Sequence, residues 1–246
     1  MIISIYVLYL SISMKINRYY TDQNITGEDM SIRDKGLLHR LSGVMRYRAG
    51  ETLKLFNGKD NFDYVYVVKE INKKEGYLTF LSKEECVSNV TQKVNVYAAI
   101  VKSDFDDMIR EMVELGVNNI YPIISDRVVR TELNYERLNK IILEASEQCG
   151  RVNIPKLSGI SKLKDFTLLS SVNICYHTKE VSQENNINNV TQEELLKNIF
   201  IGPEGGWSDS EIEWFLENNF EFKTLKTNIL RAKTAASICL YDSLSS

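Results

Sequence analysis

From residue 94 onward, the chain alternates short apolar runs with stretches whose apolar residues recur at helical spacing. The runs at 94–101 and 117–124 have the length and composition of buried strands. Between them, a regular spacing of apolar residues predicts a helix that Ser103 caps and Gly116 ends. Its apolar face consists of Phe105, Met108, Ile109, Met112 and Val113.

The same alternation continues toward the C-terminus. We expect helices at 135–148, at 208–218 and from 232 onward, and strands at 173–176, 198–201 and 222–225. Strands that alternate with helices are typical of a mostly parallel sheet covered on both faces. Residues 93–246 therefore predict an α/β domain.

Residues 50–90 follow a different pattern, in which short strands are separated by turns. Thr52–Phe56 has strand composition, and the dipeptide Asn57-Gly58 after it is a hairpin signal. The segments 62–68 and 77–81 are rich in residues that favour strands. We expect a small β-barrel or sandwich over residues 14–85, and a polar linker at 82–93.

The first 13 residues stand apart from both regions. The apolar run 2–12 is too short to span a bilayer, and it lacks the basic start of a signal peptide. We interpret residues 1–13 as an extension, or as a translation start assigned too early.

Composition limits the classes of function. The net charge of −3 gives the whole chain no electrostatic preference for nucleic acid. Residues 31–50 nevertheless carry five basic side chains and one acid, either as a solvated face or as a surface that meets phosphate. The four cysteines form no Cys-x-x-Cys pair, and there are two histidines, so we expect no metal site. We expect a cytoplasmic protein with reduced thiols and no membrane partner.

A glycine-rich turn follows the apolar run that ends at Ile201. The residues Gly202-Pro203-Glu204-Gly205-Gly206 precede Ser208 and Glu211, which have the spacing of a capping box. Glycines at a strand-to-helix turn let the backbone approach a ligand closely, although an ordinary Gly-Pro turn has the same composition. The sequence has neither a Gly-x-Gly-x-x-Gly after residue 94 nor a P-loop lysine, which argues against a dinucleotide or P-loop site.

Five blocks between residues 39 and 235 occur in a characteristic order. They are His39-Arg40-Leu41 with Leu55-Phe56-Asn57-Gly58; Lys102 with Glu114-Leu115-Gly116-Val117; Glu144-Ala145-Ser146-Glu147-Gln148-Cys149-Gly150-Arg151; Ile201 to Gly206; and Leu225 with Ile229-Leu230-Arg231 and Thr234. Together they resemble the RsmE family of 16S rRNA (uracil-N3)-methyltransferases, in the SPOUT superfamily.

The resemblance implies a PUA-like β-barrel that binds RNA, followed by a SPOUT domain with a C-terminal trefoil knot. Members of the superfamily bind S-adenosylmethionine in the knot and act as homodimers. The family methylates N3 of one uridine in 16S rRNA of the small ribosomal subunit. It implies no metal.

The resemblance also assigns roles to individual residues. Arg231 would stabilise the developing uracil anion, and Glu204 and Gln148 would hydrogen-bond substrate or cofactor. The residues expected to hold the cofactor are Ile201, Gly202, Pro203, Gly205, Gly206, Leu225, Ile229, Leu230 and Thr234. Those expected to contact RNA are Arg40, Arg46, Arg48, Lys102, Arg127 and Arg151.

Three features depart from the family pattern. Lys226 stands where a glycine is usual, Lys233 stands where an acid is usual, and the segment between Arg127 and Arg151 is several residues short. The two lysines fall beside the expected cofactor pocket. A non-catalytic RNA-binding protein derived from the family is therefore an alternative, as is an unrelated α/β enzyme whose glycine turn holds a phosphate.

Overall fold

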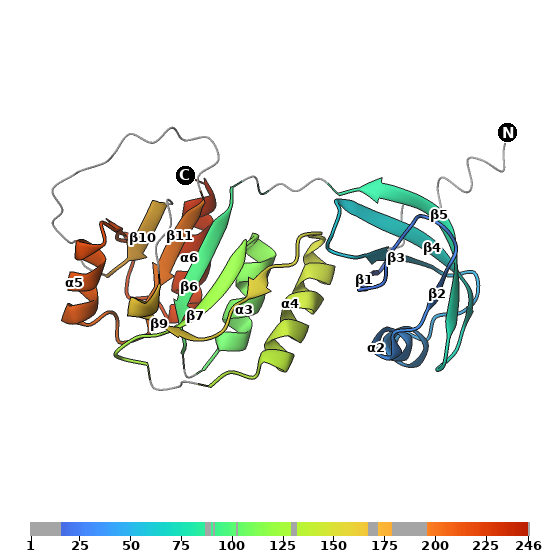
Figure 1. Cartoon of the computed structure of the whole chain (residues 1–246), viewed down its shortest axis with the longest axis horizontal. Helices are drawn as coiled ribbons and strands as arrows, with labels where there is room; N and C mark the ends of the chain where they lie inside the picture. Colours follow the sequence, from blue (N-terminus) through green and yellow to red (C-terminus); the bar gives the residue numbers. More distant parts are fainter. Residues whose placement is uncertain are drawn as a thin grey trace. The chain divides into compact units, whose positions relative to one another are not determined.

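The computed structural model describes residues 16–86, 90, 92–101, 103–128, 132–166, 172–178 and 196–245 (Figure 1). The chain divides into two compact units. The first unit comprises Met1–Val87 and Gly150–Asn153, and the second comprises Ser88–Cys149 and Ile154–Ser246. The predicted extension at 1–13 and the candidate residue Lys102 lie outside the described residues.

The first unit contains a five-stranded sheet with the order β1-β3-β4-β5-β2. The strands are β1 (Arg18–Tyr20), β2 (Met30–Ile32), β3 (Thr52–Phe56), β4 (Phe62–Ile71) and β5 (Gly76–Glu85). Neighbouring strands are antiparallel except β1 and β3, which run parallel. Leu53, Leu55 and Tyr66 are fully buried in the core of this unit.

A short helical segment precedes β3. One turn of α-helix, α2 (Lys35–Leu38), continues directly into a π-helix, η1 (His39–Val44). The Asp34 carboxylate caps α2 by accepting a hydrogen bond from the Leu37 amide. Leu38 and Leu41 are buried in the core and hold both turns in place.

The linker predicted at 82–93 is wrong over its first four residues. Strand β5 extends to Glu85, and the residues from Ser82 to Glu85 pair with those from Val65 back to Phe62. Their side chains are exposed, so their polarity reflects solvent rather than a lack of structure.

A buried ion pair joins β1 to β4. Arg18 Nε lies 2.6 Å from Asp63 Oδ1, and the two side chains are 7% and 8% exposed. The Arg18 guanidinium also donates to the Arg151 carbonyl at 2.9 Å and lies 3.4 Å from the centre of the Phe56 ring. These contacts offset the cost of removing both charges from water.

The second unit contains a seven-stranded sheet, and the neighbouring strands within its described residues all run parallel. Its main order is β12-β10-β11-β6-β7-β8, with β9 also paired to β7. Figure 1 shows β10, β11, β6 and β7 side by side in this order. The strands are β6 (Val94–Ala99), β7 (Asn119–Ile124), β8 (Lys156–Leu157), β9 (Ser161–Lys162), β10 (Val172–Tyr176), β11 (Lys197–Ile201) and β12 (Glu221–Lys223). The predicted α/β class with a parallel sheet is confirmed.

Helices pack on both faces of this sheet. They are α3 (Phe105–Leu115), α4 (Tyr135–Cys149), α5 (Asp209–Glu217) and α6 (Ala232–Ser245), with a 3-10 turn, η2, at Leu163–Asp165. On the central strand β6, Val94, Val96 and Ala98 share one core with α3, α4 and α6. Tyr97 and Ala99 point into the other core, which contains Phe215 of α5.

The start of α3 differs from the prediction. Its N-cap is Asp104, not Ser103, and Asp104 has a left-handed backbone with φ of 63° and no capping hydrogen bond from its side chain. The chain makes this left-handed step one residue before Phe105, whose ring is buried. Gly116 ends the helix as predicted, with φ of 102°.

Two rows of side chains fix the register of the central strands. Asn173, Asn198, Asn95 and Asn119 are register partners across β10, β11, β6 and β7. The Asn95 amide donates to Asn198 Oδ1 at 3.0 Å, and its Oδ1 accepts from Asn119 at 3.2 Å. Farther along, the Tyr97 ring stacks between Phe200 and Tyr121, at 4.3 Å and 4.5 Å between ring centres.

We predict that Asn95→Ala lowers the free energy of unfolding by about 3 kcal/mol, because it removes the three side-chain hydrogen bonds that the buried Asn95 amide makes with Asn198, Asn118 and Asn119. Asn153→Ala, at an exposed asparagine, is the control and should change it by less than about 0.5 kcal/mol. Urea unfolding followed by circular dichroism measures both. If both variants lowered the free energy of unfolding equally, the asparagine row would not determine stability.

We predict that Asp63→Ala destabilises the first unit by about 3–5 kcal/mol, since it leaves the buried Arg18 charge without this carboxylate. The control is Glu84→Ala, which breaks the exposed pair between Glu84 and Lys54 in the same sheet, at 2.6 Å. Glu84→Ala should lower the free energy of unfolding by at most about 1 kcal/mol. Comparable losses in urea unfolding would show that burial does not distinguish the two pairs.

Candidate active site at the carboxyl edge of the parallel sheet

The parallel strands bring four connections to one edge of the second unit. Residues 202–206 follow β11, residues 224–231 follow β12, residues 125–127 follow β7 and residue 177 follows β10. Because carboxyl ends of parallel strands share an edge, chain segments far apart in sequence meet there. Most of the predicted cofactor residues belong to the connections after β11 and β12.

The glycine turn after β11 is closely packed on its inner side. A Cβ atom on Gly202 would lie 3.1 Å from the Trp207 ring, so a side chain at this position would push against the indole. Gly206 has φ of +69°, and its amide donates to the Pro203 carbonyl at 2.8 Å. Trp207 is itself fixed, because its indole N–H donates to the Tyr176 carbonyl at the end of β10, at 3.2 Å.

The capping box predicted after the turn is present and also holds the connection after β7. Ser208 caps α5, and its amide donates to Glu211 Oε2 at 2.8 Å. The other oxygen of the buried Glu211 accepts from the Asp126 amide at 3.0 Å. Hydrogen bonds from Ser208 and Ser210 lower the pKa of the Asp126 carboxyl, which keeps this carboxylate charged.

Arg127 has a hydrogen-bond partner that could not be inferred from the sequence. Its guanidinium donates to the Gly205 carbonyl, and its aliphatic stem lies 3.3 Å from where a Gly205 Cβ would be. The side chain predicted to contact RNA therefore braces the glycine turn.

The segment after β12 combines buried and exposed side chains. Leu225 packs against the core, whereas the Ile229 side chain is 88% exposed. Arg231 is exposed directly before the first residue of α6, and its carbonyl accepts from the Ala235 amide at 2.9 Å. Thr234 and Glu204 are also exposed, while Ile201 and Pro203 are buried.

Gln148 does not join this cluster within one chain. It lies in the last turn of α4, before β8, and the first residue of β8 pairs with Asn119 at the amino end of β7. That is the edge of the sheet opposite the glycine turn. Its catalytic role stays a prediction.

The remaining RNA candidates that the structure describes belong to the first unit. Arg46 and Arg48 are exposed, and the Arg40 guanidinium lies 5.2 Å from the centre of the Tyr19 ring. Arg151 Nε donates to the Asn153 carbonyl at 2.6 Å. The RNA-binding roles of these arginines stay predictions.

The two unusual lysines differ in their surroundings. Lys226 is exposed. Lys233 Nζ lies 3.1 Å from Glu111 on α3, and the same carboxylate accepts from Ser237 at 2.7 Å. The hydrogen bond to Glu111 and the negative charge of that carboxylate raise the pKa of Lys233. Nothing in the sequence spacing indicated Glu111 as a partner of Lys233, because this contact depends on tertiary packing.

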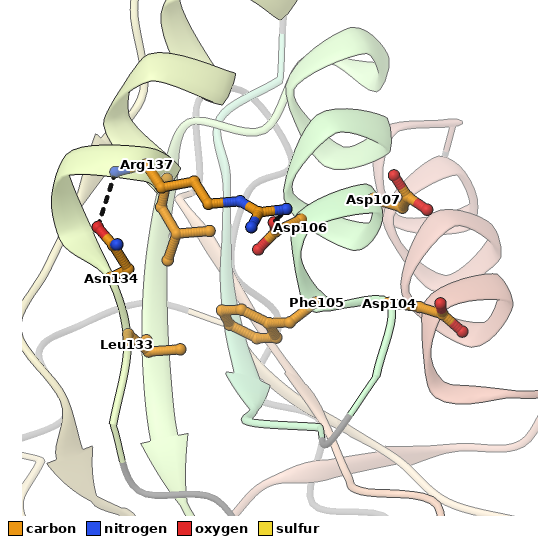
Figure 2. Close-up of a pocket in the computed structure, with 8 residues that line it drawn as sticks. Asp104, Phe105, Asp106, Asp107, Leu133, Asn134 and Arg137 are labelled. Atoms are coloured by element: carbon orange, nitrogen blue, oxygen red, sulfur yellow. Dashed lines mark hydrogen bonds and ion pairs between the residues drawn. The ribbon is translucent and has the colours of Figure 1, made fainter.

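A pocket of about 500 Å³ lies at the first turns of α3 and α4 (Figure 2). Figure 2 shows Arg137 of α4 reaching toward Asp106 of α3, and the two form an ion pair of 2.6 Å. Asp104 and Asp107 add further negative charge. The lining contains none of the predicted site residues, and its acidity disfavours phosphate groups.

The described residues contain no group of three or more His, Cys, Asp or Glu side chains that could hold a metal ion. Among the same described residues, no helix is both long enough and apolar enough to cross a bilayer.

Comparison with solved structures gives the same fold. The chain matches a putative methyltransferase of Legionella pneumophila, in complex with S-adenosylmethionine, with a TM-score of 0.79 and 26% identity over 94% of this chain and 98% of that one. A ribosomal RNA small subunit methyltransferase E from Neisseria gonorrhoeae matches with a TM-score of 0.82 and 23% identity, over 94% and 98% of the two chains.

Sequence comparison identifies the family. Residues 88–241 match the RNA methyltransferase domain. Ribosomal RNA small subunit methyltransferase E of Rickettsia conorii is 29% identical over 91% of this chain and 93% of its own length. The protein of that name from Mesomycoplasma hyopneumoniae is 33% identical over 74% of this chain and 81% of its own. The chain therefore belongs to the RNA methyltransferases of the ribosomal RNA small subunit methyltransferase E family, as the five sequence blocks indicated.

Proposed function

We propose that this chain transfers a methyl group from S-adenosylmethionine to N3 of a uridine in 16S rRNA of the small ribosomal subunit. The observation that supports the proposal is the shared sheet edge: the braced glycine turn follows β11, and the connection that ends at the exposed Arg231 follows β12, at the same edge of the parallel sheet. Family membership supplies the reaction class. The choice of uridine N3 follows from the resemblance to the RsmE family.

The glycine turn suits a ligand held mainly by backbone groups. Gly206 has a positive φ and Gly205 is exposed, and neither residue has a side chain of its own to keep a ligand away from the backbone. We assign the cofactor to residues 201–206, Leu225, Ile229, Leu230 and Thr234. The exposed Ile229 offers apolar surface to an adenosine ring. S-adenosylmethionine supplies an activated methyl group on a sulfonium.

Arg231 suits the electrostatics of the substrate. N3 of uracil is a weak nucleophile until its proton leaves, so a site that favours the anion promotes reaction. Arg231 places a cation at the N-terminus of α6, where the helix dipole is also positive. Glu204, exposed in the turn, provides a carboxylate that can accept hydrogen bonds from cofactor or substrate.

We also propose the finer features of the fold. A trefoil knot is supported by the route of the chain, which leaves the edge strand β12 and then packs α6 on the interior strands β11 and β6. A PUA-like RNA-binding role for the first unit rests on the family resemblance and on the arginines of that unit.

We further propose that the chain forms a homodimer. The proposal is supported by the apolar side chains of Ile238 and Tyr241 on α6, which are 37% and 64% exposed.

We predict that Gly206→Ala weakens S-adenosylmethionine binding at least about ten-fold, because φ of +69° strains any residue with a Cβ and shifts the turn. Gly50→Ala is the control, since Gly50 also has a positive φ, of +91°, but lies in the first unit with open space around it. Calorimetry measures both affinities. If the wild type bound no cofactor, the non-catalytic alternative would replace the enzyme.

We predict that Arg231→Ala lowers kcat by about 100-fold or more, while cofactor affinity changes by less than about three-fold, because the interaction forms mainly in the transition state. Lys226→Ala removes an exposed cation from the same connection and should leave kcat nearly unchanged. Mass spectrometry of nucleosides from 16S rRNA, taken over time, identifies the methylated product and measures its rate of formation. Wild-type turnover in Arg231→Ala would reject the anion role.

A further inference from the structure

The π-helix η1 of the first unit ends in two exposed apolar side chains. Val44 is 63% exposed and Met45 is 46% exposed. On either side of them the chain is anchored: Leu41 is fully buried, and Tyr47 packs against the core and meets the Tyr19 ring edge-on at 6.1 Å. Val44 and Met45, here called the apolar tip, therefore project from a fixed base.

The backbone of this segment is held in an uncommon conformation. The Met45 amide donates to the Arg40 carbonyl at 2.8 Å, and the Tyr47 amide donates to the Leu41 carbonyl at 2.9 Å. Between these two bonds, Arg46 has φ of 58°, a left-handed conformation that is unusual for a residue with a side chain. π-Helical turns and strained residues concentrate at functional sites.

The sequence on either side of the apolar tip is basic. Arg33, Lys35, Arg40, Arg46 and Arg48 fall within residues 31–50 with Asp34 as the one acid, in a chain whose net charge is −3. Glu51 partly offsets this charge, since its carboxylate accepts from the Arg48 amide at 2.6 Å. The excess of arginine complements a polyphosphate backbone.

We propose that the apolar tip contacts an unpaired base of a folded RNA, while Arg46 and its basic neighbours contact the adjoining phosphates. Paired RNA presents phosphates and riboses, and its stacked bases offer no apolar face. Loops and bulges expose such faces. The proposal deepens the RNA-binding role proposed for the first unit, and it makes the unit selective for non-duplex RNA.

The test uses the full chain and two RNA probes with equal numbers of phosphates, a hairpin with an unpaired loop and a fully paired duplex. Fluorescence anisotropy gives both affinities over a range of salt concentrations. The double variant Val44→Ser, Met45→Ser should bind the hairpin about ten-fold more weakly, with duplex affinity and salt slope unchanged. Arg46→Ala should weaken both probes and reduce the salt slope by about one.

The control is Leu81→Ser, which removes another apolar side chain, 54% exposed on β5, and should affect neither probe. Equal weakening of hairpin and duplex by the double variant would overturn the base contact. No weakening of either probe, with altered self-association in light scattering, would make the tip a protein interface instead. Calorimetry of S-adenosylmethionine binding separates this outcome from failure of the methyltransferase proposal, because the tip variants should bind cofactor like the wild type.

Discussion

The register of the parallel sheet is the constraint on which the candidate site depends. Asn95 hydrogen-bonds to asparagines on β7 and β11, and Asn198 continues the row to Asn173 on β10. A shift of one residue would break this row and would also move every apolar side chain of the strands to the opposite face. The row at the amino edge therefore determines which residues emerge at the carboxyl edge.

At that edge, hydrogen bonds between connections take the place of regular secondary structure. The indole of Trp207 ties the glycine turn to β10, Arg127 ties it to the connection after β7, and Asp126 binds the start of α5. Each bond joins segments that are distant in sequence. A backbone fixed in this way holds a ligand without first having to become ordered, which favours precise positioning.

The sequence predicted the elements that have a regular spacing of apolar residues or a local capping pattern. The apolar spacing from Phe105 to Val113 located α3, and Ser208 with Glu211 located the start of α5. The sequence did not predict the features that depend on single residues or on long-range contacts. Strands of three residues such as β1 carry too short a pattern, and Asp104 rather than Ser103 caps α3 because of a left-handed backbone step. The sequence blocks that contain Gln148 and Arg231 could not show that these residues lie at opposite edges of the sheet within one chain, and no spacing pairs Lys233 with Glu111.

The tight contact between Gly202 and Trp207 has a spectroscopic consequence. The chain has two tryptophans, and both Trp207 and Trp214 lie in the aromatic cluster around Phe215. Trp207 lies directly beneath the glycine turn and is almost completely shielded from water. A displacement of the turn thus alters the environment of an indole whose emission depends on polarity. The protein carries an intrinsic optical reporter at the place where its ligand would act, and no label has to be introduced to follow it.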